Sequence, residues 1–138
     1  MHLLIDGYMQ EDAVAVDDVS KWLRDYPSMI DMNVIAGPVV RKIDEMLTGL
    51  VVIAESHISV HVDRKTRATH IDVFSCKPFD HRRVEADVID MFKLQSASSR
   101  VFAREGDFLA DRDLTMEHLA HGVERLTDSR RIREGRQP

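Results

Sequence analysis

Two neighbouring segments of the chain carry side chains able to act as nucleophile, base or acid: Ser56, His57 and His61, and then Cys76. His57 and His61 share one face of a strand because they are four residues apart. The first possible chemistry is a metal site of His57, His61 and Cys76, and the second is a Cys76 thiolate activated by a histidine. In the plain alternative, Cys76 is a small buried hydrophobe and the histidines are exposed strand residues. No Cys-x-x-Cys or His-Glu-x-x-His pattern supports zinc, so we expect no metal.

The segments that position these residues have the strongest β pattern in the chain. Apolar residues alternate over residues 50–62, which predicts one long strand, and residues 69–76 predict a second strand that pairs with it as an antiparallel hairpin. In an unbroken strand, Ser56 faces away from His57 and His61. A meeting of Ser56 with His61 therefore requires a bulge or kink near Glu55 and Ser56.

The remaining periodicity predicts helices and strands on both sides of this hairpin. We expect strands at residues 3–5, stopped by Asp6-Gly7, at 32–40 and at 101–103, and helices at 12–25, before Pro27, at 81–93, capped by Asp80, and at 114–126. The Gly37-Pro38 pair makes the strand at 32–40 an edge or bent strand. The expected fold is α+β: an antiparallel sheet with helices packed on one face in the order βαβ-β-β-αβ, a two-layer sandwich. Residues 1–126 form one domain in this prediction, and residues 127–138 form a charged, disordered tail.

Charge and hydrophobicity limit the kinds of partner that we expect the chain to bind. The chain has 138 residues, 19 Lys and Arg against 24 Asp and Glu, and a formal net charge of −5, which argues against nucleic-acid binding. No apolar run approaches the roughly 20 residues that cross a bilayer, so we expect no membrane partner. Cys76 is the only cysteine and no signal peptide is evident, so we expect a cytoplasmic protein with a small-molecule substrate.

The order of the residues points further. The block Glu55-Ser56-His57-x-x-x-His61, followed by Asp72-x-Phe74-x-Cys76, resembles the core of the prokaryotic S-adenosylmethionine decarboxylases. The opening Leu-Ile-Asp-Gly at residues 4–7 is similar to the first strand of that family. The resemblance extends from residue 1 to about residue 104.

The resemblance implies a self-processing enzyme. The peptide bond between Glu55 and Ser56 would cut itself, and Ser56 would become a pyruvoyl group, the cofactor that forms a Schiff base with the substrate. By the family pattern, His61 is the base for processing and Cys76 is the proton donor to the decarboxylated carbon, while Thr48 stands where the family has an assisting serine and His57 supports the site. Two copies would pair through their sheet faces as a homodimer, which also covers exposed apolar surface.

Substrate recognition departs from the family pattern. Lys65 replaces a glutamate that binds the ribose hydroxyls, with Asp63 as a possible substitute, and no aromatic ring occupies residues 39–42, where the family stacks one on adenine. Tyr8 and Phe79 are the aromatic side chains that could approach instead. The leading prediction is decarboxylation of S-adenosylmethionine, supplying the aminopropyl donor for spermidine. The alternatives are arginine or ornithine, whose distal cation would pair with Asp63, Asp72 or Glu45, and an unprocessed, non-catalytic homologue that binds a ligand or a partner subunit.

Overall fold

The computed structural model of the chain describes residues 1–11 and 14–103, and this part contains six strands and two helices. Their bounds are β1 His2–Met9, α1 Val16–Met29, β2 Val34–Ile43, β3 Met46–Ile53, β4 Ser56–Asp63, β5 Ala68–Ser75, α2 His81–Met91 and β6 Leu94–Phe102. The predicted helix at 114–126 and the tail at 127–138 lie outside the described residues.

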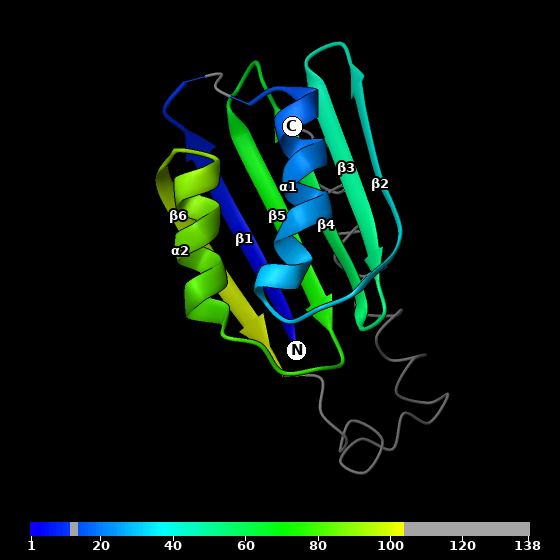
Figure 1. The fold of residues 1–138 in the computed structure, drawn as a ribbon. Helices are drawn as coiled ribbons and strands as arrows, with labels where there is room; N and C mark the ends of the chain where they lie inside the picture. The colour runs from blue at the N-terminus through cyan, green and yellow to red at the C-terminus, as the bar shows by residue number, and fades with distance from the viewer. Residues whose placement is uncertain (12–13, 104–138) are drawn as a thin grey trace, which may run out of the picture. The chain divides into compact units, whose positions relative to one another are not determined.

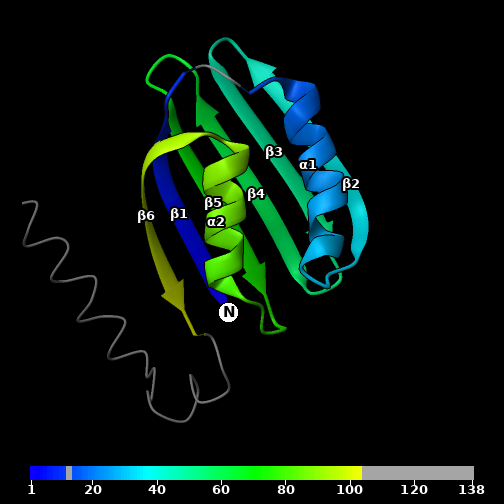
Figure 2. The same cartoon turned by 60° about the vertical axis from the view of Figure 1, so that its left-hand side comes forward.

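The strands form one antiparallel sheet in the order β2-β3-β4-β5-β1-β6. Helices α1 and α2 lie side by side on the same face of this sheet (Figures 1 and 2). Helix α1 packs over β2 and β3, and α2 packs against β6. The predicted α+β two-layer architecture is confirmed, with one strand more than the sequence analysis expected.

The additional strand arises because residues 50–62 do not form a single strand. The chain reverses at Ala54 and Glu55, and Ile53 of β3 pairs with Ser56 of β4 across this two-residue turn. The buried positions change phase at the turn, from Val51 and Ile53 before it to Ile58 and Val60 after it. Residues 50–53 are all apolar, so the sequence pattern concealed the phase change.

Strand β1 continues through Asp6-Gly7, where the sequence analysis predicted its end. Gly7 faces the helices, and a Cβ atom there would lie 2.7 Å from the backbone oxygen of Ser96 and 2.8 Å from Cδ1 of Leu94. The glycine therefore permits close packing inside the sheet instead of breaking the strand. Strand β6 is correspondingly long, beginning at Leu94 and not at Val101. Strand β2 is an edge strand with register shifts around Gly37 and Pro38, as predicted.

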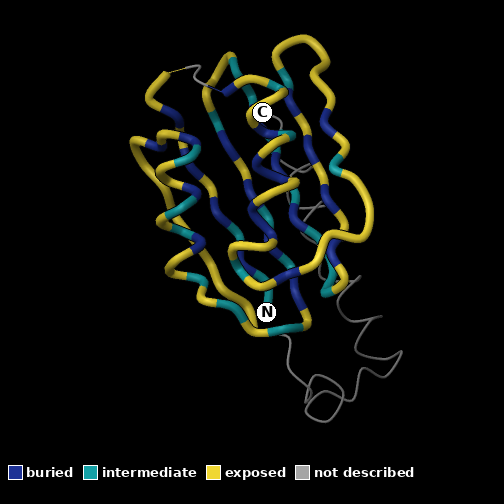
Figure 3. Tube along the Cα trace, in the orientation of Figure 1, coloured by how far each residue is buried: buried dark blue, intermediate teal, exposed yellow. Residues whose placement is uncertain are grey.

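The core fills the space between the helices and the middle of the sheet. Figure 3 shows that buried positions concentrate in the inner strands, whereas β2 and β6 are largely exposed. Alternate residues of β1, β3, β4 and β5 meet apolar residues of the helices, and the fully buried members include Leu3, Leu23, Val51, Ile58, Val60, Val73, Val84, Val88 and Phe92. Of the described elements, neither α1 nor α2 covers the opposite face of the sheet, and in this sense it is called the uncovered face.

Both helices differ in detail from their predicted bounds. Helix α1 starts at Val16 and includes Pro27 in its last turn, which was expected beyond its end. Helix α2 begins after Asp80, whose carboxylate accepts hydrogen bonds from the backbone N–H groups of Arg82 and Arg83, so this predicted N-cap is confirmed. Within the described residues, neither helix has the length and apolar composition needed to cross a membrane.

Candidate active site

Ser56 is the first residue of β4 and follows the turn directly. Its φ angle is 153°, a backbone conformation that L-residues rarely adopt and that costs roughly 1–3 kcal/mol. Its hydroxyl oxygen and Nδ1 of His57 are hydrogen-bonded at 3.1 Å. The predicted scissile residue is therefore strained and lies beside an imidazole.

Cys76 lies next to this turn because it directly follows β5, whose last residue Ser75 pairs with Ser56. The backbone N–H of Cys76 donates a hydrogen bond of 3.0 Å to the carbonyl oxygen of Glu55. A backbone donor aimed at a carbonyl can stabilise the negative charge that develops on the oxygen when a nucleophile attacks the carbon. The side chain of Cys76 belongs to an exposed residue and is accessible to a ligand.

Thr48 and His61 form a second polar pair farther along the sheet. They are cross-strand partners of β3 and β4, and Thr48 Oγ1 is hydrogen-bonded to His61 Nδ1 at 2.8 Å. The bond fixes the imidazole ring, so any proton transfer by His61 would use Nε2. Thr48 and His61, which the sequence analysis selected separately, are thus direct hydrogen-bond partners.

The two pairs are well separated within the chain. Ser56 and His61 are five residues apart on β4, which corresponds to about 16 Å along an extended strand. The structure therefore brings Ser56 together with His57 and the backbone of Cys76, and it places His61 with Thr48. The sequence analysis expected Ser56, His61 and Cys76 within mutual reach, and one copy of the chain does not achieve this.

The uncovered face of the sheet continues the polar row beyond His61. The rings of His61 and His70 have centroids 6.4 Å apart, and His70 Nδ1 is hydrogen-bonded to Asp6 Oδ1 at 2.6 Å. The sequence analysis did not select His70 or Asp6; the strand register would have revealed them, because His61 pairs with His70 and His70 with Asp6. Within residues 1–11 and 14–103, no three His, Cys, Asp or Glu side chains are grouped so as to hold a metal ion.

The four predicted substrate-binding residues lie in different surroundings. Exposed Tyr8 lines a hollow of about 280 Å³ on the sheet, together with Asp6, His70, Ser96 and Ser98. The Asp63 carboxylate accepts hydrogen bonds from the backbone N–H groups of Lys65 and Thr66 in the turn after β4, and bonding to Thr66 lowers the pKa of Asp63. Lys65 is exposed in the same turn, and Phe79 packs against the core. Of these four, Tyr8 adjoins a hollow.

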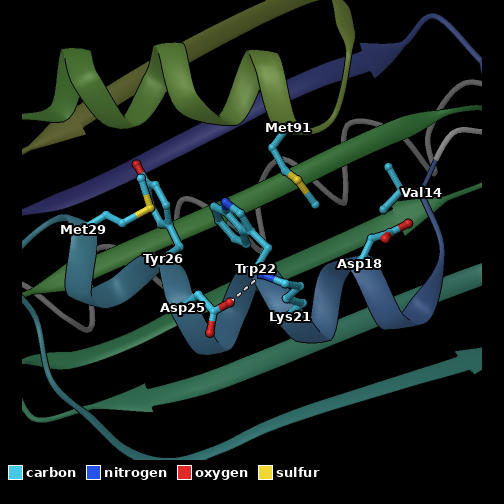
Figure 4. A pocket seen from close by; sticks show the side chains of 8 residues that line it. All are labelled: Val14, Asp18, Lys21, Trp22, Asp25, Tyr26, Met29 and Met91. Carbon is cyan, nitrogen blue, oxygen red and sulfur yellow. Dashed lines mark hydrogen bonds and ion pairs between the residues drawn. The ribbon is translucent and has the colours of Figure 1, made fainter.

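A second hollow lies on the helical side of the molecule (Figure 4). It has a volume of about 350 Å³, and its lining consists of Val14, Asp18, Lys21, Trp22, Asp25, Tyr26, Met29 and Met91. None of the predicted site residues contributes to it. The hollow is therefore separate from the Ser56 turn and from the polar row on the opposite face of the sheet.

Comparison with known proteins identifies the family. The sequence model for S-adenosylmethionine decarboxylase matches residues 1–105. The chain belongs to the S-adenosylmethionine decarboxylase family. The crystal structure of the adenosylmethionine decarboxylase from Aquifex aeolicus has a similar fold, with a TM-score of 0.62 and 20% sequence identity over 76% of this chain and 93% of that chain. None of the curated proteins compared with the chain matches it significantly.

Members of the S-adenosylmethionine decarboxylase family are lyases that depend on a pyruvoyl group, and the residues at the turn fit the formation of such a group. Ser56 supplies the three carbons and the hydroxyl that the conversion consumes. Three features would assist an attack by the hydroxyl: the strained backbone of Ser56, the neighbouring imidazole of His57, and the hydrogen bond from the Cys76 N–H to the Glu55 carbonyl oxygen.

Proposed function

We propose that the chain is a pyruvoyl-dependent S-adenosylmethionine decarboxylase that cuts itself between Glu55 and Ser56 and contributes the aminopropyl donor for spermidine. The observation that carries the proposal is the hydrogen bond from the Cys76 N–H to the Glu55 carbonyl oxygen at 3.0 Å. The bond polarises the carbonyl that Ser56 must attack, and it places Cys76 beside the residue that would carry the new group.

In the proposed self-cleavage, every reacting group comes from a copy of this chain. The Ser56 hydroxyl gives its proton to His57, and its oxygen attacks the Glu55 carbonyl carbon, whose oxygen is held by the Cys76 N–H. The peptide C–N bond then breaks and leaves an ester between Glu55 and Ser56. His61 then removes the α-proton of Ser56, and the Glu55 carboxylate leaves. Water replaces the amino group at position 56, which departs as ammonia. The products are residues 1–55 and a chain that begins with the pyruvoyl group at position 56.

Catalysis then depends on what surrounds position 56. The pyruvoyl ketone supplies an electrophile for the substrate amine and takes up the electrons released with carbon dioxide. Cys76 returns a proton to the substrate carbon, a role for which a thiol with an ordinary pKa of about 8.5 is suited, because it holds its proton near neutral pH and releases it readily. The exposed position of Cys76 next to the turn supports this assignment.

A second copy of the chain completes the site in this proposal. Because His61 lies about 16 Å from Ser56 on the same strand, the His61 that serves Ser56 comes from a partner. The uncovered face carries exposed apolar side chains, including Tyr8, Leu50, Val52 and Phe102, which pairing of two faces would bury. A two-fold axis that crosses β4 between Ile58 and Ser59 would set His61 of each copy over Ser56 of the other, because positions 56 and 61 are symmetric about that point.

One alternative keeps the chemistry and changes the substrate. The hollow beside Tyr8 contains the Asp6 carboxylate, which suits a substrate with a distal cation, such as arginine or ornithine. Purified protein is assayed for carbon dioxide release from S-adenosylmethionine, arginine and ornithine under identical conditions. We expect turnover with S-adenosylmethionine; exclusive turnover of a basic amino acid would establish the alternative, and no release from any of the three would reject both.

Mass spectrometry under denaturing conditions tests self-cleavage directly. The wild-type chain should appear as residues 1–55 and a second fragment that carries a pyruvoyl group at position 56. Ser56→Ala should appear as one chain of full length, because the attacking hydroxyl is absent, while circular dichroism shows a retained fold. An intact wild-type chain of 15.8 kDa would instead support a non-catalytic, ligand-binding homologue.

A further inference from the structure

Two loops hold the turn at Ala54 and Glu55 from opposite sides. In the loop between α1 and β2, Asn33 accepts a hydrogen bond of 2.8 Å from the N–H of Ala54, and its own N–H donates to the side chain of Glu55 at 3.3 Å. In the segment after β5, the N–H of Cys76 donates to the carbonyl oxygen of Glu55. These three hydrogen bonds all join the turn to the two flanking loops, so the loops help to fix the position of the turn.

Lys77 joins the two loops to each other. Its ammonium group donates a hydrogen bond of 2.8 Å to the backbone oxygen of Asp31 and forms an ion pair with the Asp31 carboxylate. The hydrogen bond and the positive charge of this ammonium group lower the pKa of Asp31 below its ordinary value. One side chain therefore closes a ring that runs from Asp31 to Asn33, through the turn to Cys76, and back to Lys77.

The base of Lys77 is itself fixed to the core. The hydroxyl of Ser75, a fully buried residue, accepts a hydrogen bond of 2.9 Å from the N–H of Lys77 and donates one of 2.8 Å to the Lys77 oxygen. The backbone of Ser75 exchanges two further hydrogen bonds with Met1, the residue before β1. The ammonium group of Lys77 thus connects the loop at Asp31 to a rigid part of the sheet.

We propose that Lys77 and Asp31 are positioning residues for self-cleavage: their ion pair closes the two loops on the turn and holds the Glu55 carbonyl against the Cys76 N–H. A strained residue such as Ser56 persists only where the surrounding structure over-determines its backbone, and the ring of contacts supplies that constraint. The proposal rests on the self-cleavage described above, and it assigns a function to the lysine that follows Cys76.

Rates of self-cleavage test the proposal. The full chain is made by cell-free synthesis, and the conversion of full-length protein into two fragments is followed over time well below the melting temperature. Lys77→Ala and Asp31→Asn should each slow cleavage by up to about fivefold, the upper end of the range expected for an exposed ion pair, and the double variant should be no slower than either one. Lys77→Arg should restore the rate, which loss of general stability would not explain.

The matched control is Lys21→Ala, which removes another exposed Lys–Asp pair, with Asp25 on α1, and should leave the cleavage rate unchanged. Wild-type cleavage rates in both Lys77→Ala and Asp31→Asn would overturn the proposal.

Hydrogen exchange tests the closed ring without relying on cleavage. In the uncut Ser56→Ala chain, amide exchange at Cys76 and Ala54 is measured by NMR with and without Lys77→Ala. Exchange at both amides should accelerate in Lys77→Ala and not in Lys21→Ala. Unchanged exchange rejects the ring of contacts, whereas an intact wild-type chain rejects the proposed function, so the two failures are distinguishable.

Discussion

Ser56 is hydrogen-bonded to His57, whereas the family pattern designates His61 as the base for processing. Its hydroxyl contacts His57, the next residue, whereas His61 is bonded to Thr48. The proposed chemistry needs two bases, one for the hydroxyl proton and one for the α-proton of the ester, and it assigns the first to His57 and the second to His61. Both histidines have a role in this arrangement without any change in strand geometry.

In the proposed mechanism, Cys76 contributes its backbone to cleavage and its side chain to turnover, so a single substitution should separate the two steps. Cys76→Ala keeps the N–H that bonds to Glu55 and should cleave at close to the wild-type rate. Removal of the thiol should lower turnover by about a hundredfold or more, or protonate the product at the wrong carbon. Fragment formation and carbon dioxide release are measured on the same preparation. Full turnover by Cys76→Ala would show that the thiol only packs.

The candidate residues for the proposed reaction could be selected from the sequence, but their grouping in space could not. The spacing of the block from Glu55 to His61 and the position of Cys76 led to the prediction of a nucleophile at Ser56, a base at His61 and an acid at Cys76, with His57 in support. The distance between Ser56 and His61 depends on whether the strand continues or turns, which residue types alone do not determine. The pairing of His70 with Asp6 needs the register of three strands and so depends on tertiary structure.

The turn between β3 and β4 is the element that the sequence pattern concealed. Two-residue hairpins usually have Gly, Asn or Asp, which tolerate positive φ angles. Here the turn residues are Ala54 and Glu55, and the positive φ occurs at Ser56 instead. The absence of turn residues explains why one long strand was predicted, and it also places backbone strain at the proposed cleavage site.

Contact between the two helices offers a test of the layer that supports the sheet. Tyr26 of α1 is buried, stacks on Trp22 with ring centroids 4.7 Å apart, and donates a hydrogen bond of 3.0 Å to Asp87 of α2. Tyr26→Phe should lower the free energy of unfolding by about 1 kcal/mol at pH 7, measured by urea denaturation. Tyr8→Phe, at an exposed position, is the matched control and should have little effect.

The same substitution should alter how stability depends on pH. Burial, together with the bond to Asp87, raises the pKa of Tyr26 above its ordinary value of 10.0. A group with a raised pKa in the folded state contributes stability that is complete below the unfolded pKa and is lost as the pH rises above it. The stability advantage of the wild type over Tyr26→Phe should therefore shrink above pH 10. An advantage that is constant into this alkaline range would contradict the burial of this hydroxyl.

At the scale of the molecule, the two faces of the sheet have different roles. One face is covered by α1 and α2 and carries the core, while the other holds the histidine row among exposed apolar side chains. Because the Ser56 turn lies at one end of β4 and the Thr48–His61 pair lies farther along it, a single copy contains both halves of the proposed site at separate positions. Pairing two copies would create two complete sites at once.

A mixture of two inactive variants tests this arrangement. Ser56→Ala lacks the attacking hydroxyl, and His61→Ala lacks the proposed processing base, so neither should cleave alone. When both are co-expressed with different affinity tags, the His61→Ala copy has an intact Ser56 and should meet the intact His61 of its partner. A fraction of the His61→Ala chains should therefore be cut, while every Ser56→Ala chain stays whole, as read by mass spectrometry of each tagged chain.

Which of the two tagged chains is cut shows whether His61 acts on Ser56 of the partner copy or on Ser56 of its own copy. If His61 served the Ser56 of its own chain, a partner could not restore the missing imidazole, and both variants would stay uncut in mixed dimers isolated through both tags. If His57 sufficed for both proton transfers, His61→Ala would cleave without a partner. The 16 Å estimate between the two positions on β4 favours rescue, because rotation of side chains alone cannot close a gap of five extended residues.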